Sequence, residues 1–171
     1  MSKYDVSVCI PTYCSDYDNF IRTLTSIIRQ RGCSYEIVIA DDGTPGFRQQ
    51  EIEAWMEEHH VQDYSSARNK GVVRNVLNAY SIAEGRYVKL LSPNDYFYDD
   101  TALAGMLHFM ESEGHRIAFG RSCYYSMSDG QFHIYNGMQP YQLRPHLERD
   151  IPAIKEAYLV CQDYATGAAF M

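Results

Sequence analysis

The sequence lacks the cysteine pattern of a disulfide framework or a closed zinc site. Its five cysteines are an odd number and form no CxxC pair, whereas such sites need paired, closely spaced thiols. This usage favours reduced thiols and a cytoplasmic location. We expect Cys9, which lies within an apolar run, to be a small core residue rather than a nucleophile.

Positive charge is also scarce, because 15 Lys and Arg residues face 22 Asp and Glu residues, giving a formal net charge of -7. Nucleic acids are bound by cationic surfaces, so we expect no nucleic-acid partner, and any anionic ligand needs a local cluster of cations. The sequence has neither a membrane-spanning apolar run nor the extended apolar segment of a signal peptide. Peripheral association with the inner face of a membrane stays open.

Several catalytic signatures are missing as well. The sequence contains no GxGxxG or Walker-type loop, no GxSxG elbow and no HExxH pair. It therefore lacks the phosphate cradles of dinucleotide and P-loop enzymes and the nucleophile of the common serine hydrolases.

What the sequence does have is a regular alternation of short apolar runs and amphipathic stretches. Its 171 residues, 46% of them hydrophobic, predict a single ordered domain. We expect strands at Val6–Ile10, Tyr35–Ala40, Val61–Tyr64 and Tyr87–Leu91, and helices at Asn19–Arg31, Phe47–His59, Val72–Ala83 and around Leu103–Met110. This order predicts an α/β fold, with a mostly parallel, Rossmann-like sheet flanked by helices. We expect Pro11 to end the first strand.

The pattern changes from about Ile117. Asp129-Gly130 between two alternating segments predicts a β-hairpin, and a helix is expected around Ile151–Val160. A run of small residues, TGAAFM, follows near Met171.

Polar clusters follow three of the expected strands: Thr12-Tyr13, Asp41-Asp42-Gly43 and Pro93-Asn94-Asp95. Ligands of parallel sheets bind beyond the carboxyl ends of the strands, so these clusters are expected to face one crevice. Carboxylates there can coordinate Mg²⁺ or Mn²⁺.

Each acidic cluster also has a simpler interpretation. Asn94 and Asp95 could cap a helix beginning near Asp99 or shape the turn after Pro93, and Asp-Gly is an ordinary turn signal. Recurrence of carboxylates at one rim favours a shared ligand.

A cationic segment, Ala67–Asn75, leads into the third expected helix. It contains Arg68, Lys70 and Arg74 in an otherwise acidic chain. Cations at a helix N-terminus suit a diphosphate, although a solvated helix start explains the same pattern.

Four blocks in order, VSVCIPTY, EIVIADDGT, NKGVVRNVLNAYSIAEGRYVKLLSPNDYF and TGAAFM, resemble the nucleotide-sugar-binding part of family 2 glycosyltransferases, which have the GT-A fold. The resemblance implies an inverting transfer from a nucleotide-diphosphate sugar, with a UDP-sugar favoured, to a glycan or lipid-linked acceptor in cell-surface polysaccharide synthesis. It also implies a single domain over 1–171, with 1–116 as the nucleotide-binding part and 117–171 as the start of the acceptor side.

The resemblance implies roles for individual residues. Pro11 and Tyr13 would pack around the nucleobase and ribose, and Asp42 would accept a hydrogen bond from the base. Arg74 and Asn75 would lie near the nucleotide, with Arg74 the favoured diphosphate partner. The block LLSPND matches the family's metal motif, so its last residue, Asp95, would bind Mn²⁺ or Mg²⁺.

This chain departs from the family pattern in two places. Ser92 and Asn94 stand where many relatives have acidic residues, which predicts weaker metal binding, with Asn94 contacting ribose or donating a carbonyl oxygen. The family's general base would lie beyond Met171, because Asp163 comes too early in the pattern. The chain is therefore expected to lack the segment that carries the acceptor site and the base.

Two other functions stay open. A non-catalytic or truncated nucleotide-sugar-binding module would show the same motifs. A phospho-acceptor regulatory domain also clusters aspartates, but there the acidic pair follows the first strand rather than the second.

Overall fold

Four parallel strands form the central sheet of the first unit of the chain, in the order β3-β2-β1-β4. The structure is a computed structural model, and it describes residues 2–46, 49–59, 61–65, 68–118, 120, 123–129, 131–134 and 150–160. The strands are β1 (Tyr4–Thr12), β2 (Tyr35–Asp41), β3 (Gln62–Ser65) and β4 (Gly85–Leu90). Strand pairing is parallel throughout this sheet, as the alternation of strands and helices predicts.

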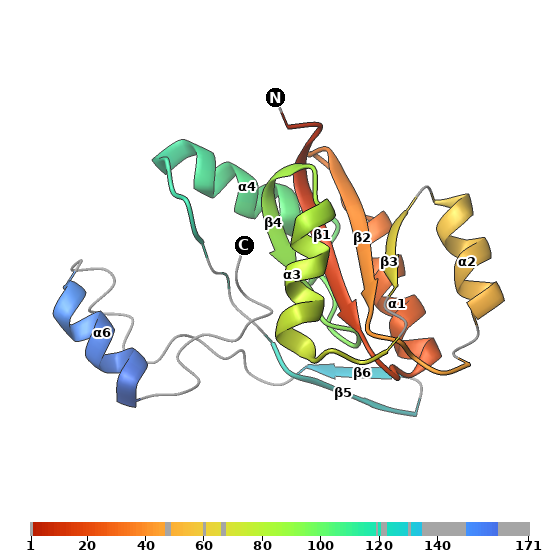
Figure 1. The fold of residues 1–171 in the computed structure, drawn as a ribbon. Coiled ribbons are helices and arrows are strands. Elements are labelled where there is room, and N and C mark those ends of the chain that lie inside the picture. The colour runs from red at the N-terminus through yellow and green to blue at the C-terminus, as the bar shows by residue number, and fades with distance from the viewer. Residues whose placement is uncertain are drawn as a thin grey trace. The chain divides into compact units, whose positions relative to one another are not determined.

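Helices cover both faces of this sheet (Figure 1). They are α1 (Tyr17–Ile28), α2 (Gln49–Glu58), α3 (Val72–Ile82) and α4 (Ala102–Glu113). Side chains of α1, α2 and α4 share one core with β1 residues Val6, Val8 and Ile10. The opposite face is covered by α3, whose Ala79 packs with Cys9 and Val38. This two-sided burial explains why the strands are nearly continuous apolar runs.

Local signals set where α1 begins and where α4 ends. The Asp16 side chain accepts a hydrogen bond from the Asn19 backbone N–H, so α1 begins two residues earlier than its apolar spacing predicts. Gly114 ends α4 in the left-handed conformation, with a φ of 69°.

The prediction that Pro11 ends the first strand is wrong. β1 continues to Thr12, with Pro11 opposite Ala40 of β2. Successive residues of a parallel strand direct their hydrogen-bonding groups to alternate neighbours, and the Cys9 carbonyl bonds toward β4, accepting from Leu91 N. Pro11 therefore faces the same side, beyond the last β1–β4 pair at Leu90, where no strand requires its missing N–H.

The chain divides into two units, residues 1–118 and 119–170. In the second, β5 (Tyr125–Ser128) and β6 (Gln131–Ile134) pair antiparallel with Ser128 opposite Gln131, which confirms the predicted hairpin. The predicted helix is also present, as α6 (Ile151–Val160). The TGAAFM run lies outside the described residues, and the assignment of 1–171 to one functional domain stays a prediction. Within the part described, no helix has the length and apolar character needed to cross a bilayer.

Candidate functional site

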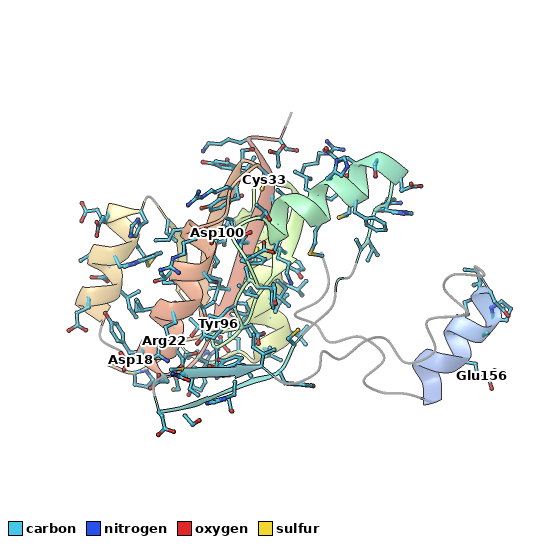
Figure 2. All side chains as sticks on the ribbon, turned by 180° about the vertical axis from the view of Figure 1, so that it is seen from behind. Asp18, Arg22, Cys33, Tyr96, Asp100 and Glu156 are labelled. Atoms are coloured by element: carbon cyan, nitrogen blue, oxygen red, sulfur yellow. The ribbon has the colours of Figure 1, made fainter. Side chains whose placement is uncertain are left out.

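The carboxyl ends of β1, β2 and β4 bring the polar clusters to one edge of the sheet. Because these strands are parallel and adjacent, they end at the same rim, where their last residues are Thr12, Asp41 and Leu90. Helix α1 starts at this rim, and Figure 2 places its Asp18 and Arg22 toward the same end of the first unit as Tyr96, with Cys33 toward the other end. The rim is therefore formed by segments far apart in the sequence.

Asp42 is the most strongly held of the predicted site residues. Only 2% of it is exposed, and its carboxylate accepts hydrogen bonds from the backbone N–H groups of Lys70 (2.9 and 3.1 Å) and Gly71 (2.9 Å). Its own N–H donates to the Thr12 carbonyl at 2.9 Å. A buried carboxylate at the start of α3 is favoured by these donors and by the helix dipole. Asp42 thus joins the ends of two strands to the start of a helix.

The neighbouring Asp41 forms the turn that the Asp-Gly pair predicts. Its side chain accepts hydrogen bonds from Gly43 N (3.0 Å), Thr44 N (2.8 Å) and Thr44 Oγ1 (2.6 Å). Thr44 Oγ1 in turn accepts a bond from Cys14 N at 2.8 Å. The turn after β2 therefore supports the segment after β1, where Tyr13 is 48% exposed and available to a planar ligand. Sequence reasoning missed Thr44, which stands three residues after Asp41 as the partner in an Asx-type turn.

Asn75 holds the rim together from α3. It is 3% exposed, and its Nδ2 donates to the Ala40 carbonyl at 2.8 Å and to the Thr12 carbonyl at 3.3 Å. Its Oδ1 is buried and has no hydrogen-bond partner among the residues that the structure describes. The preceding residue, Arg74, is exposed. The two adjacent residues therefore differ in role: Asn75 positions the strand ends, and Arg74 is accessible to a ligand.

The Ser92–Asp95 segment is a β-turn. Asp95 N donates to the Ser92 carbonyl at 3.0 Å, and Asn94 has a φ of 80°. Pro at the second position and a positive φ at the third are the features of a type II turn, and Asn tolerates that φ better than most residues. Asn94 N also donates to Thr23 Oγ1 at 2.9 Å, which ties the turn to α1. The turn interpretation is confirmed for this segment.

The helix cap predicted as an alternative for Asn94 and Asp95 is not present, because the N-cap residue of α4 is Thr101, which makes no side-chain cap hydrogen bond. Asp99 forms a turn just before the helix, where its side chain accepts bonds from Thr101 N (2.8 Å) and Thr101 Oγ1 (2.9 Å). Asp95 itself is half-buried.

Lys89 is a charged residue of this region that sequence reasoning missed. It is 2% exposed, and its Nζ donates to the Leu90 carbonyl at 2.8 Å. Burial lowers the pKa of Lys89 from its ordinary value of 10.5 to about 8, and the charge of Asp95 acts in the opposite direction. Burial raises the pKa of Asp95, while Lys89 and the Ser92 turn lower it. The signal was a lysine inside the apolar strand sequence YVKLL, since buried cations are normally paired.

A metal at this rim would have few protein ligands. Among the described residues, no group of three or more His, Cys, Asp or Glu side chains gathers in a metal-binding arrangement. Asp95 supplies one carboxylate, and Asn94, which is exposed, supplies an amide oxygen. These donors fit a Mg²⁺ or Mn²⁺ ion that takes its remaining ligands from phosphates and water.

Cys9 is confirmed as a core residue. It has no exposed surface, and burial raises the pKa of its thiol to about 12, with a further contribution from the charge of Glu36. A thiol of this kind is not a nucleophile at neutral pH.

Comparison with known proteins identifies the family and the class of fold. The family model described as Glycosyl transferase family 2 matches residues 7–168. A UDP-Glc:alpha-D-GlcNAc-diphosphoundecaprenol beta-1,3-glucosyltransferase, WfaP from Escherichia coli, is 30% identical over 129 residues, covering 72% of this chain and 47% of the relative.

Solved structures of similar fold come from two other proteins. S. aureus TarS 1-349 in complex with UDP-GlcNAc has a TM-score of 0.63 at 21% identity, covering 74% of this chain and 36% of that one. The mannosyltransferase PcManGT from Pyrobaculum calidifontis, in complex with GDP-Man and Mn2+, has a TM-score of 0.60 at 19% identity, covering 72% and 36%. The chain thus spans half or less of the length of these proteins. The predicted fold class is confirmed.

Proposed function

Because this chain belongs to glycosyltransferase family 2, we propose that it binds a nucleotide-diphosphate sugar and transfers the sugar to a glycan or lipid-linked acceptor. The transfer inverts the configuration at the anomeric carbon and contributes to cell-surface polysaccharide synthesis. A UDP-sugar is the favoured donor, since TarS was solved with UDP-GlcNAc and WfaP is named for UDP-Glc. The enzyme acts in the cytoplasm, at the inner face of the membrane where a lipid-linked acceptor is presented.

One observation carries this proposal: Tyr13, Asp42 and Asp95 leave three different strands at a single edge of the sheet. Tyr13 offers an exposed aromatic face for the nucleobase. The Asp42 carboxylate, already oriented by two backbone N–H groups, accepts a further bond from the base. Pro11, at the same end of β1, packs against the ribose.

In this proposal the diphosphate lies between Arg74 and Asp95. Arg74 lies exposed in the first turn of α3, where its guanidinium can pair with a phosphate and the helix dipole favours negative charge. Asp95 would hold the divalent cation, with Asn94 as a second oxygen donor or a ribose contact. A bound Mn²⁺ or Mg²⁺ would neutralise the charge that develops on the leaving diphosphate. Asn75 contributes by keeping the ends of β1 and β2 in place.

Titration of the chain by calorimetry with UDP, GDP, CDP and dTDP, each with and without Mn²⁺, tests the proposal. UDP with Mn²⁺ should bind most tightly. Asp95→Asn should remove the Mn²⁺-dependent part of the affinity, since an amide is a weaker ligand than a carboxylate.

A matched control is Asp100→Asn, because Asp100 is on the same connection to α4 but pairs with Arg31 on the surface at 3.6 Å. That variant should bind UDP like the wild type. Equal loss in both variants, or no binding of any nucleotide by the wild type, would reject the site.

The second candidate is a non-catalytic nucleotide-sugar-binding module. It is favoured by the Ser92 and Asn94 replacements, which leave one carboxylate in the metal motif. Release of UDP from UDP-glucose or UDP-GlcNAc in the presence of acceptor distinguishes the two: turnover supports the transferase, and tight binding without turnover supports the module.

A further inference from the structure

Helix α3 carries an apolar surface that faces away from the sheet. Its exposed members are Val72, Val73, Leu77 and Tyr80, of which Val73 is 69% and Leu77 58% exposed. We call these four residues the α3 stripe. The helix already fills its place in the core with Asn75 and Ala79, which are buried. The stripe is therefore additional apolar surface that packing on the sheet does not require.

The four side chains form one continuous surface. At 100° per residue, Val73, Leu77 and Tyr80 follow the i, i+4, i+7 spacing of neighbours along one side of a helix, and Val72 extends this side at its first turn. Figure 1 shows α3 in front of the strands, with no other described helix of the first unit in front of it. Contiguous exposed apolar surface of this kind marks a site of interaction with a partner or a membrane.

Charge around the stripe distinguishes between these partners. The chain as a whole is acidic, yet no Asp or Glu occurs between Asp63 and Glu84. The same stretch holds Arg68, Lys70 and Arg74, all exposed at or just before the start of α3. Exposed apolar side chains and a tyrosine on a helix that has cations at its start and no acidic residue are the composition of a helix lying on an anionic lipid surface.

We propose that the α3 stripe docks this protein on a membrane that carries anionic lipid headgroups. The proposal deepens the proposed function, because it identifies the surface by which the chain meets a lipid-linked acceptor. Since α3 runs opposite to the parallel strands, its first turn, with Val72 and Val73, lies at the rim that holds Asp42 and Asn75. Docking by the stripe would therefore bring the lipid surface to the edge of the nucleotide site.

Co-sedimentation with phospholipid vesicles tests this docking surface. Vesicles of phosphatidylcholine with phosphatidylglycerol should bind the chain, vesicles of phosphatidylcholine alone should bind it far less, and added NaCl should weaken binding. Combining Val73→Ser with Leu77→Gln should reduce partitioning by about tenfold or more, from lost apolar burial. Lys70→Gln should reduce it by about fivefold, the contribution of one cation at an anionic surface.

The matched control is Phe109→Gln, which removes an exposed apolar side chain from α4, on the opposite face of the sheet. It should bind vesicles like the wild type. All variants change exposed side chains, so their thermal unfolding should match that of the wild type, and the UDP affinity of the Val73/Leu77 and Phe109 variants should be unchanged. The UDP measurement separates a failure of membrane docking from a failure of the proposed function.

Three results would overturn the proposal. The first is absence of wild-type binding to the anionic vesicles, and the second is equal binding by the Val73/Leu77 variant. The third is a dimer in analytical ultracentrifugation that the same variant converts to monomer, which would assign the stripe to a second copy of the chain.

Discussion

Replacing Lys89 with methionine should stabilise the protein at neutral pH, although it removes a hydrogen bond. Lys89 is 2% exposed, and its ammonium group donates to the Leu90 carbonyl. Burial lowers its pKa from 10.5 to about 8. At about 1.4 kcal/mol for each pKa unit, holding this charge in the folded state costs about 3 kcal/mol.

Methionine has a similar length and no charge, so Lys89→Met removes that cost. The Leu90 carbonyl then loses the bond at 2.8 Å from Nζ, which costs about 1 kcal/mol. The net expectation is a gain of about 2 kcal/mol in the free energy of unfolding at about pH 7.

The stability difference between the wild type and Lys89→Met should depend on pH, because only the wild type has the titrating ammonium group. In the unfolded chain Lys89 keeps its proton up to a pH near 10.5, whereas in the folded chain it loses the proton near pH 8. Between these values the unfolded state binds more protons, so wild-type stability rises with pH through this window and stays at its lower level below it. Lys89→Met lacks this rise, and its advantage over the wild type should disappear by about pH 10.

Urea unfolding of both proteins at about pH 7 and about pH 10 measures the difference between them. Comparing the two proteins cancels the contributions of tyrosines and other groups that titrate in the same range. If Lys89→Met is less stable than the wild type at about pH 7, or if the gap between the two proteins does not change with pH, the assignment of a buried, charged Lys89 is wrong.

Three other substitutions test the fold and the rim. Gly85→Ala would press a Cβ against the backbone nitrogen of Ser7 in β1, so the free energy of unfolding should fall by about 2 to 3 kcal/mol in thermal unfolding. The control Gly105→Ala in α4 has nothing within 4 Å of its Cβ, so the free energy of unfolding should rise by about 0.5 to 1 kcal/mol. Asp42→Asn should lose about 1 to 3 kcal/mol, because an amide cannot accept all the backbone bonds that hold the α3 start, and should also weaken UDP binding in calorimetry; full UDP affinity in the folded variant would contradict the nucleobase role. Asn94→Asp adds a second carboxylate beside Asp95 and should raise Mn²⁺ affinity by about tenfold, measured by calorimetry with UDP present; Asn94→Gly, which tolerates the same φ, should show no gain.

Hydrophobic periodicity was sufficient to predict the order and type of the elements in both units. Buried strands such as YEIVIA and amphipathic helices such as Asn19–Arg31 carry this information locally, because apolar residues must repeat at the period of the element they belong to. The end of the first strand was predicted wrongly, since whether Pro11 is tolerated depends on the length of β4, whose residues pair with β1 residues 81 positions earlier, as in Tyr4 opposite Gly85. Local sequence cannot contain that information.

The location of the candidate residues at one rim of the sheet was predictable, but their individual interactions were not. The position of Asp42, Asn75 and Asp95 at strand and helix ends follows from the alternation of elements. That Asn75 bonds to the carbonyls of Thr12 and Ala40 depends on how α3 packs over two strand ends. Periodicity places a residue on a face of its helix, and only packing chooses the atoms it meets.

The sequence by itself determined the α/β class, the parallel pairing of the strands and the rim at which polar residues gather, because these follow from periodicity, from the alternation of strands and helices and from turn chemistry within a few residues. Only the tertiary structure decided that Asp42 and Asn75 hold the rim together, that Lys89 is buried where its charge interacts with that of Asp95, and that the α3 stripe is exposed. Burial and hydrogen bonding are properties of segments brought together in space, and a single stretch of sequence does not specify them.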